Sequence, residues 1–329
     1  MKAAWFNQFG QASEVLQVGE VDKPVPSHGE VLIRMRTSGV NPSDTKKRLG
    51  SFPDLLDNGP VIPNSDGAGV IEAVGAGVPH SRIGERVWVY QAQYGRLHGT
   101  AAEYVSIDSK RAVPLPENTS FVEGACLGIP AMTAHRSVFS DGPVEGQWLL
   151  ITGGAGRVGH YAIQWAKHAG AMVIATASNE EARRHCMEAG ADYVVDHRSD
   201  GMVDEVLEFT GGVKVDRVID VEFGANLPRV LELIRIGGVI ATYSSTVVTE
   251  PALPFKQMMF MDLTLRLIIV YAMPESAKEA AMEDITWALE NNRLQHRIAE
   301  TYTLDDIAKA NQKIEDGGFY GCVVVEVEA

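Results

Sequence analysis

Residues 148–170 read WLLITGGAGRVGHYAIQWAKHAG. The apolar run at 148–152 predicts a buried strand, and the pattern after it predicts an amphipathic helix that stops at Gly170. Between them, residues 154–159 spell GAGRVG, a complete GxGxxG motif. Its glycines permit a tight turn, close approach of the backbone to a pyrophosphate, and close packing of the helix on the strand. Because the motif joins a strand to a helix, this stretch predicts a dinucleotide-binding loop.

The sequence after this stretch keeps alternating between strand and helix patterns. Apolar runs at 172–178, 193–196 and 215–221 are separated by the helical patterns EEARRHCMEAG and MVDEVLEFTGG. Further strands are predicted at GGVIATYSS and LTLRLIIVY, followed by a helix at 276–292. Strands and helices at this spacing predict βαβ units and therefore an α/β fold with a doubly wound parallel sheet.

The sequence before this region has a different pattern of predicted secondary structure. Short strand-like runs, VLIRMR, GAGVIEAV, RVWVY and AAEYVSI, are broken by loops such as NGPVIPNSDG. Runs of this length bounded by glycine and proline predict a β-rich unit. The final run GCVVVEV predicts one more strand, which we expect to return to the first unit.

Composition limits the classes of partner. The 329 residues, 45% apolar and 22% charged, are typical of a soluble globular protein of two domains. Its 29 basic and 43 acidic residues give a net charge of −14, which opposes binding to nucleic acid or to an anionic membrane. The three cysteines form neither a disulfide framework nor a metal-binding knuckle, which favours the cytoplasm. No secretory signal is visible, and the apolar run at 263–273 is too short to span a bilayer, so we expect a buried strand there.

The end of the second predicted strand indicates which dinucleotide binds. A site for NAD places a carboxylate there to bind the ribose 2′-hydroxyl, whereas residues 175–179 read ATASN. Ser178, followed by Arg183 and Arg184, suits a 2′-phosphate instead. The sequence therefore favours NADPH/NADP+, with Arg184 slightly preferred as the phosphate contact.

Six further stretches, GVNPSDTKKRLG, VIPNSDGAGVIEAVG, GERVW, GTAAEYV, LPENTSFVEGACLGIPAMTAHR and AGADYVVD, lie along nearly the whole chain. With the glycine-rich loop they resemble the zinc-independent quinone oxidoreductases of the zeta-crystallin type, in the medium-chain dehydrogenase/reductase superfamily. The resemblance implies a GroES-like catalytic domain at 1–125 and 275–329 and a Rossmann domain at 126–274. It also implies a homodimer formed by pairing of the edge strand at 263–271.

The resemblance bears on metal content as well. Zinc-using relatives place their ligands at positions that here read Asn41, Ser65 with Asp66, and about Ile129. Asparagine and serine are not usual zinc ligands, and the four-cysteine lobe of those relatives is missing. We therefore expect no metal.

Candidate cofactor contacts are the glycine-rich loop, polar residues at the carboxyl ends of predicted strands, and two positions taken from the resemblance, Thr133 and His197. The full set is Thr133, Gly153, Gly154, Ala155, Gly156, Arg157, Val158, Gly159, Ser178, Arg183, Arg184, His197, Tyr243, Ser244 and Ser245.

With no metal and no evident nucleophile, the predicted chemistry is hydride transfer from an oriented nicotinamide to a flat electrophile. The resemblance places GVNPSDTK at the substrate pocket, where Asn41 as donor and Lys46 as cation would stabilise an anionic quinone. Asp44 would bond the nicotinamide ribose or position Lys46, and Phe52 would line the pocket. The family usually carries tyrosine at positions 46 and 52.

Two other functions stay open at this stage. The same site would suit an enone or enoyl-type alkene reductase, which needs a proton donor that Lys46 or water would supply. A nucleotide-binding protein with a structural or RNA-binding role is a third reading, which the net charge of −14 opposes.

Overall fold

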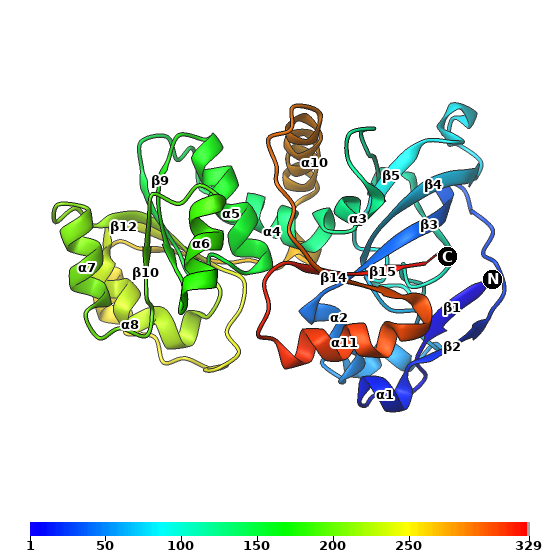
Figure 1. Ribbon diagram of the computed structural model, residues 1–329, viewed down its shortest axis with the longest axis horizontal. Helices are drawn as coiled ribbons and strands as arrows, with labels where there is room; N and C mark the ends of the chain where they lie inside the picture. Colours follow the sequence, from blue (N-terminus) through cyan, green and yellow to red (C-terminus); the bar gives the residue numbers. More distant parts are fainter. Residues whose placement is uncertain (328–329) are drawn as a thin grey trace. The chain divides into compact units, whose positions relative to one another are not determined.

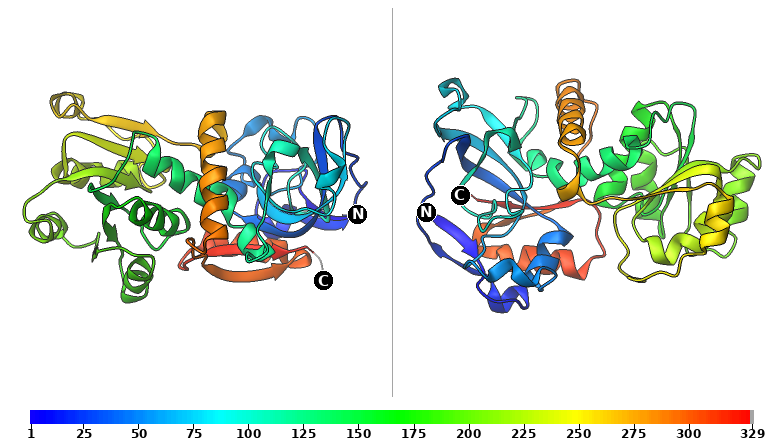
Figure 2. Two further views of the ribbon diagram at one scale, coloured as in Figure 1. Left: turned by 90° about the horizontal axis from the view of Figure 1, so that it is seen from above. Right: turned by 180° about the vertical axis from the view of Figure 1, so that it is seen from behind.

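The computed structural model describes residues 1–327, and the chain divides into two compact units. The first comprises Met1–Ile129 and the chain from Met282 onward, and the second comprises Pro130–Ala281. Helix α10 (Glu275–Glu290), orange in Figure 2, contains the second division. The predicted domain limits at 125/126 and 274/275 lie four and seven residues before these divisions.

The second unit is built on six parallel strands in the order β10-β9-β8-β11-β12-β13. Their bounds are Trp148–Ile151 for β8, Met172–Thr176 for β9, Tyr193–Val195 for β10, Val215–Asp220 for β11, Ile234–Thr242 for β12 and Thr264–Leu267 for β13. The strand order runs outward from β8 in one direction and then in the other, so the prediction of a doubly wound parallel sheet is confirmed.

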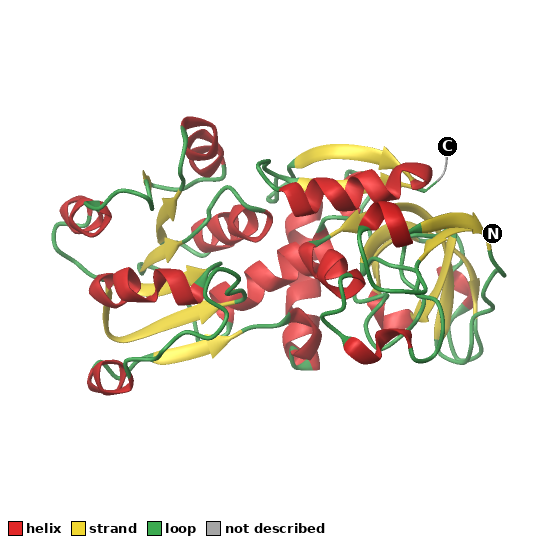
Figure 3. Cartoon of the chain, turned by 90° about the horizontal axis from the view of Figure 1, so that it is seen from below, coloured by secondary structure: helices red, strands yellow, loops and turns green. Residues whose placement is uncertain are grey.

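Helices cover both faces of this sheet (Figures 1 and 3). On one side lie α5 (Arg157–His168) and α6 (Glu180–Glu188), and on the other lie α7 (Met202–Phe209) and α8 (Phe223–Leu233). Helix α4 (Met132–Phe139) packs on α5, and α9 (Phe255–Phe260) precedes β13. Apolar strand residues such as Leu150 and Ile174 are fully buried between these layers.

Two predicted helix ends are confirmed in detail. Gly170 follows α5 with φ +78°, and Gly190 follows α6 with φ +108°. A residue with a Cβ rarely adopts this left-handed conformation, so the glycines end the helices where the sequence predicts.

The resemblance implies an edge strand at 263–271, and β13 does stand at the edge of the sheet, but the expected length of this strand and its expected burial are wrong. Pairing with β12 covers only Thr264–Leu267, and the chain then forms a 3-10 turn at Val270–Ala272. This strand is also not buried, because it is the edge of the sheet: Leu267 is 72% exposed. An apolar run looks the same in a central strand and in an edge strand, and only the sheet order separates them.

The first unit carries the β-rich part of the chain. Its main sheet has the order β14-β15-β3-β4-β5-β7, with β6 paired to β3, beside the hairpin β1-β2. The strands are β1 Lys2–Trp5, β2 Gln17–Glu20, β3 Glu30–Val40, β4 Asp66–Val74, β5 Arg86–Val89, β6 Tyr104–Asp108, β7 Ala112–Pro114, β14 Ile298–Thr303 and β15 Cys322–Glu326. Its helices, besides most of α10, are α1 Ala12–Val15, α2 Pro42–Arg48, α3 Phe121–Gly124 and α11 Ile307–Asp316, with single 3-10 turns at Pro53–Leu56, His80–Arg82, Ser109–Arg111 and Leu304–Asp306.

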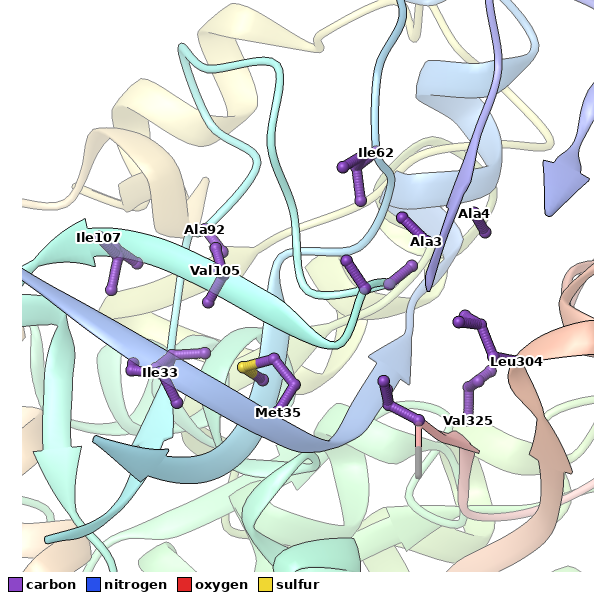
Figure 4. Packing of buried hydrophobic residues seen from close by; sticks show 14 of the residues in the cluster. Ala3, Ala4, Ile33, Met35, Ile62, Ala92, Val105, Ile107, Leu304 and Val325 are labelled. Carbon is purple, nitrogen blue, oxygen red and sulfur yellow. The ribbon is translucent and has the colours of Figure 1, made fainter. Parts of the chain in front are cut away.

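The predicted return of the chain's last strand is confirmed. β15 pairs antiparallel with β3, placing Val325 opposite Ser38. Figure 4 shows Val325 and Leu304 from this last segment together with Ile33 and Met35 of β3, all members of one buried apolar cluster. The C-terminal residues therefore complete the core of the first unit. Among residues 1–327, no helix is long and apolar enough to cross a membrane.

Candidate functional site

The glycine-rich loop joins β8 to α5. Gly156 stands at the N-cap of α5 in an extended conformation, and its backbone N–H donates to the Gly153 carbonyl at 2.9 Å. The end of β9 holds the loop from the other side, because Thr176 Oγ1 accepts the Gly153 N–H at 2.9 Å and the Thr176 carbonyl accepts the Gly154 N–H at 3.1 Å. The loop is therefore fixed at the carboxyl edge of the sheet, at the positive end of a helix.

Each glycine of the motif has its own steric reason. A Cβ at Gly154 would lie 2.8 Å from the Ala175 Cβ, and a Cβ at Gly159 would lie 2.4 Å from the Gly153 carbonyl oxygen. At Gly156, which is exposed, the one heavy atom within 4 Å is that same carbonyl oxygen at 3.1 Å. Two glycines thus serve internal packing, and the third leaves bare backbone open to a ligand, as a pyrophosphate requires. Of the remaining loop residues, Ala155 is buried, and Arg157 and Val158 are half-buried.

The region expected to meet the 2′-phosphate carries no acid at the end of β9. Asn179 caps α6 by accepting the Ala182 N–H at 2.9 Å, and Ser178 is half-buried. The two arginines differ: Arg183 donates to the Val194 carbonyl, whereas Arg184 is 65% exposed and lies 3.7 Å from Glu188. The guanidinium of Arg184 is therefore the more accessible, and its contact with the 2′-phosphate stays a prediction.

His197 lies just beyond β10 in the same unit. Its backbone carbonyl accepts a hydrogen bond from Arg229. Burial and the nearby charges of Arg198 and Arg229 lower the pKa of its imidazole. No local pattern predicts the contact with Arg229, because this residue comes from α8, about 30 residues further along the chain.

The residues after β12 line a cavity of about 440 Å³ in the second unit. Tyr243, Ser244 and Ser245 contribute to it, together with Leu265 and Leu267 of β13. The Ser245 hydroxyl is already engaged, since it accepts the Gly224 N–H at 2.9 Å and donates to the Val248 carbonyl at 2.5 Å. The Ser245 hydroxyl therefore stabilises the conformation of residues 245–248.

Thr152 and Asp220 are a pair that sequence reasoning missed. The Thr152 hydroxyl donates to Asp220 Oδ1 at 2.6 Å and accepts the Val221 N–H at 2.9 Å. Asn226 also donates to Asp220 Oδ1, at 2.7 Å. The pair ties the ends of β8 and β11 together beside the glycine-rich loop.

Thr133, predicted as a cofactor contact, is buried in α4. Its backbone carbonyl accepts a hydrogen bond from the Ser137 hydroxyl at 2.8 Å.

In the first unit, Asn41 and Asp66 form the centre of a buried polar cluster. Asn41 precedes α2 and donates its side-chain amide to Asp66 Oδ2 at 2.8 Å, while its backbone N–H donates to Asp44 Oδ2 at 2.9 Å. Asp66 Oδ2 also accepts the Ile129 N–H at 2.8 Å. Gly128 permits this approach, since a Cβ there would lie 2.1 Å from Asp66 Oδ1.

α2 brings Lys47 to this cluster and turns Lys46 to solvent. Lys47 is only 4% exposed, and its ammonium donates to Ser65 Oγ at 3.3 Å, whereas Lys46 is exposed. Successive helical residues point about 100° apart, and Asp44, Lys47 and Arg48 lie on the buried side of α2, whereas Lys46 lies outside it. Phe52, predicted to line the substrate pocket, is 40% exposed in the first unit.

Burial dominates the electrostatics of the cluster. It raises the pKa of Asp66 to about 8, with a further contribution from the charge of Asp44. It also raises the pKa of Asp44 and lowers the pKa of Lys47, whose charge the two carboxylates favour. One ammonium facing two carboxyls is neutral when one carboxyl keeps a proton, and both raised pKa values favour that state.

The donor set does not fit zinc. The side chains at the expected ligand positions are an amide, a hydroxyl and one carboxyl, and Ile129 offers only its backbone, whereas zinc takes cysteine, histidine or acidic ligands. Within residues 1–327, no three such side chains are grouped so that they would hold a metal ion.

Comparison with known proteins places this geometry in a family. Residues 27–117 match the family described as "Alcohol dehydrogenase GroES-like domain", and residues 158–287 match "Zinc-binding dehydrogenase". The quinone oxidoreductase of Pongo abelii is 30% identical over 96% of this chain and 94% of its own length. The chain belongs to the quinone oxidoreductase family of medium-chain dehydrogenases/reductases.

Other members show how broad this oxidoreductase superfamily is. An alcohol dehydrogenase of Geobacillus stearothermophilus is 35% identical over 65% of this chain and 68% of its own length. A mycobacterial quinone oxidoreductase of known structure is 28% identical, with a TM-score of 0.88, covering 99% of this chain and 100% of the other. A mycobacterial structure described as complexed with NADPH is 27% identical, with the same TM-score of 0.88. This chain therefore shares its fold with both mycobacterial structures.

Proposed function

We propose that the protein is an NADPH-dependent reductase that transfers hydride to a quinone, or to a similar flat electrophilic carbonyl compound, without zinc. The observation that carries this proposal is the bare backbone at Gly156, next to a second strand that ends without an acid. Full-length similarity to quinone oxidoreductases supports the substrate class.

The residues of the second unit suit NADPH. The Gly153–Gly159 loop and the N-terminus of α5 hold the pyrophosphate, and the exposed Arg184 meets the 2′-phosphate beside Ser178 and His197. Thr133, Tyr243, Ser244 and Ser245 are proposed contacts on the nicotinamide side. When bound, NADPH supplies the hydride.

The first unit supplies polar groups for the charge that hydride transfer creates. A quinone that accepts hydride becomes a hydroquinone anion, which a proton then neutralises. Asn41 donates one amide N–H to Asp66, and its second N–H is the proposed donor to the substrate oxygen. Asp44 anchors the backbone of Asn41, and Lys46 and Phe52 complete the proposed site.

We further propose a cytoplasmic homodimer. The edge strand β13 ends with Leu267, and Leu267 and Ile269 are 72% and 54% exposed. An unpaired edge with apolar side chains is suited to pairing with a second copy. Cys126, Cys186 and Cys322 are all free, as in a reducing compartment.

An absorbance assay tests the catalytic proposal. Purified protein is mixed with NADPH or NADH and 1,2-naphthoquinone, with and without a chelator, and loss of the reduced cofactor is followed. We expect chelator-insensitive turnover that prefers NADPH. Turnover abolished by the chelator contradicts the zinc-independent mechanism, and a preference for NADH contradicts the 2′-phosphate site.

Alkene reduction is a second candidate. A 2-methylene-furan-3-one reductase of Solanum lycopersicum is 32% identical over 62% of this chain and 54% of its own length. Conjugated enones in the same assay separate the two: reduction of enones with no quinone turnover favours the alkene reductase.

A further inference from the structure

Helix α2 (Pro42–Arg48) carries two adjacent lysines in opposite environments. Lys46 is exposed, whereas Lys47 is 4% exposed beside Ser65. A buried ammonium is costly unless anions and hydrogen bonds compensate its charge. The groups around Lys47 therefore indicate what its buried ammonium does.

The neighbours of Lys47 are the groups that hold Asn41. Asp44 lies three residues earlier on the same helix, and its charge favours the ammonium, as does that of Asp66. Asp44 accepts the backbone N–H of Asn41, and Asp66 accepts its side-chain amide. One cation thus faces both carboxyls that orient a single asparagine.

We propose that Lys47 is a positioning residue for hydride transfer, whose buried ammonium keeps one negative charge on the pair Asp44 and Asp66, from which Asn41 takes its orientation. The inference rests on the proposed function, in which Asn41 donates to the substrate oxygen. It adds the buried Lys47 to the exposed Lys46 of the proposed site, and it assigns Lys47 no contact with substrate.

The reason is electrostatic. Without the ammonium, two carboxyls in one dry cluster are stabilised only by taking up protons. A carboxyl group that takes up a proton still accepts through its carbonyl oxygen, but a neutral acceptor holds the N–H groups of Asn41 less strongly than a carboxylate does. The other titratable group facing Asp66 is the thiol of Cys126, whose pKa burial raises, so it stays neutral and leaves the balance to Lys47.

The test compares Lys47→Met with Lys46→Met and with Lys110→Met, the last being an exposed lysine outside the cluster. The double variant Asp44→Asn/Lys47→Met removes one charge of each sign. Three quantities are measured: kcat and KM with 1,2-naphthoquinone, Kd for NADPH, and the infrared titration of the carboxyl band that disappears in Asp66→Asn.

In Lys47→Met we expect kcat to fall about tenfold while Kd for NADPH stays within roughly twofold. The Asp66 band should titrate about one pH unit higher, because a nearby cation favours the carboxylate. The double variant should regain most of the lost kcat, since it leaves no uncompensated charge. Lys110→Met should match the wild type.

Three outcomes overturn the inference: an unchanged titration in Lys47→Met, an unchanged kcat despite a shifted titration, or a loss confined to Lys46→Met. If Lys47→Met fails to fold, a double variant with wild-type stability but no kcat beyond background also overturns it. Wild-type protein that reduces neither quinones nor enones contradicts the proposed function instead, and the titration then decides by itself whether Lys47 controls the cluster.

Discussion

The side-chain amide of Asn41 donates to Oδ2 of Asp66 at 2.8 Å, and both residues are buried. The same oxygen accepts the Ile129 N–H, so it is held in place as an acceptor. The NH2 group of Asn41 therefore faces Asp66. The amide is thereby oriented before any substrate arrives, which is the condition for effective stabilisation of a developing anion.

Replacing Asn41 by alanine should therefore lower kcat with 1,2-naphthoquinone by about 10²-fold, the usual effect of losing one oriented donor. Binding of NADPH to the second unit should change little, as measured by quenching of protein fluorescence. Asn291→Ala, at an exposed asparagine of the first unit, is the matched control. Equal kcat in both variants would remove Asn41 from the mechanism.

Gly159→Ala should weaken NADPH binding by more than about tenfold, because its Cβ would lie 2.4 Å from the Gly153 carbonyl oxygen and displace the loop. Gly201→Ala is the control, since Gly201 has φ −84° and nothing closer than 3.7 Å to an added Cβ. Titration calorimetry gives both dissociation constants. Similar affinities for the two variants would contradict the assignment of the loop.

Arg184→Ala should reduce the preference for NADPH over NADH about tenfold, through loss of a charged hydrogen bond to the 2′-phosphate. Affinity for NADH should stay the same, which separates this effect from general damage. Glu188→Gln, which releases Arg184 from its neighbour 3.7 Å away, should tighten NADPH binding. A loss that is equal for both cofactors would assign the contact elsewhere.

The pKa of Asp66, raised to about 8 in the folded chain, links stability to pH. The folded state holds this proton more tightly than the unfolded state, in which the pKa of Asp66 is near 3.8. The proton therefore contributes its full stabilisation of the folded state below about pH 3.8. It is lost as the pH rises through about 8. In urea unfolding between about pH 5 and about pH 8, the wild type should lose more stability than Asp66→Asn. Parallel curves would refute the raised pKa.

Leu267→Glu should convert the proposed dimer into a monomer of about 36 kDa in light scattering, because a carboxylate at the exposed edge of β13 opposes pairing with a second copy. Val25→Glu, at an 82% exposed valine of the first unit, should leave the oligomeric state unchanged. A wild-type monomer would exclude the dimer outright.

Much of the second unit follows from the sequence. The βαβ alternation, the glycine loop and the helix stops at Gly170 and Gly190 depend on residues close together in the chain, and all of them are present. The exposure of Leu267 and Ile269 could not be predicted from the apolar pattern alone, because it depends on where the strand stands in the sheet. The Thr152–Asp220 and His197–Arg229 contacts join residues about 70 and 30 positions apart, beyond the reach of any local pattern.

By itself, the sequence determined that this protein has a dinucleotide loop, a parallel sheet to carry it, and no acid at the end of the second strand. These are properties of backbone conformation and local chemistry. Only the tertiary structure decided which hydrogen bonds join Asn41, Asp66 and Ile129, and that Lys47 and not Lys46 lies among them. Two adjacent lysines on a helix look alike in sequence. Their burial differs because the side of α2 that carries Lys47 and Arg48 packs inward. Arg48 there donates to Glu315 of α11, more than 260 residues away in the chain.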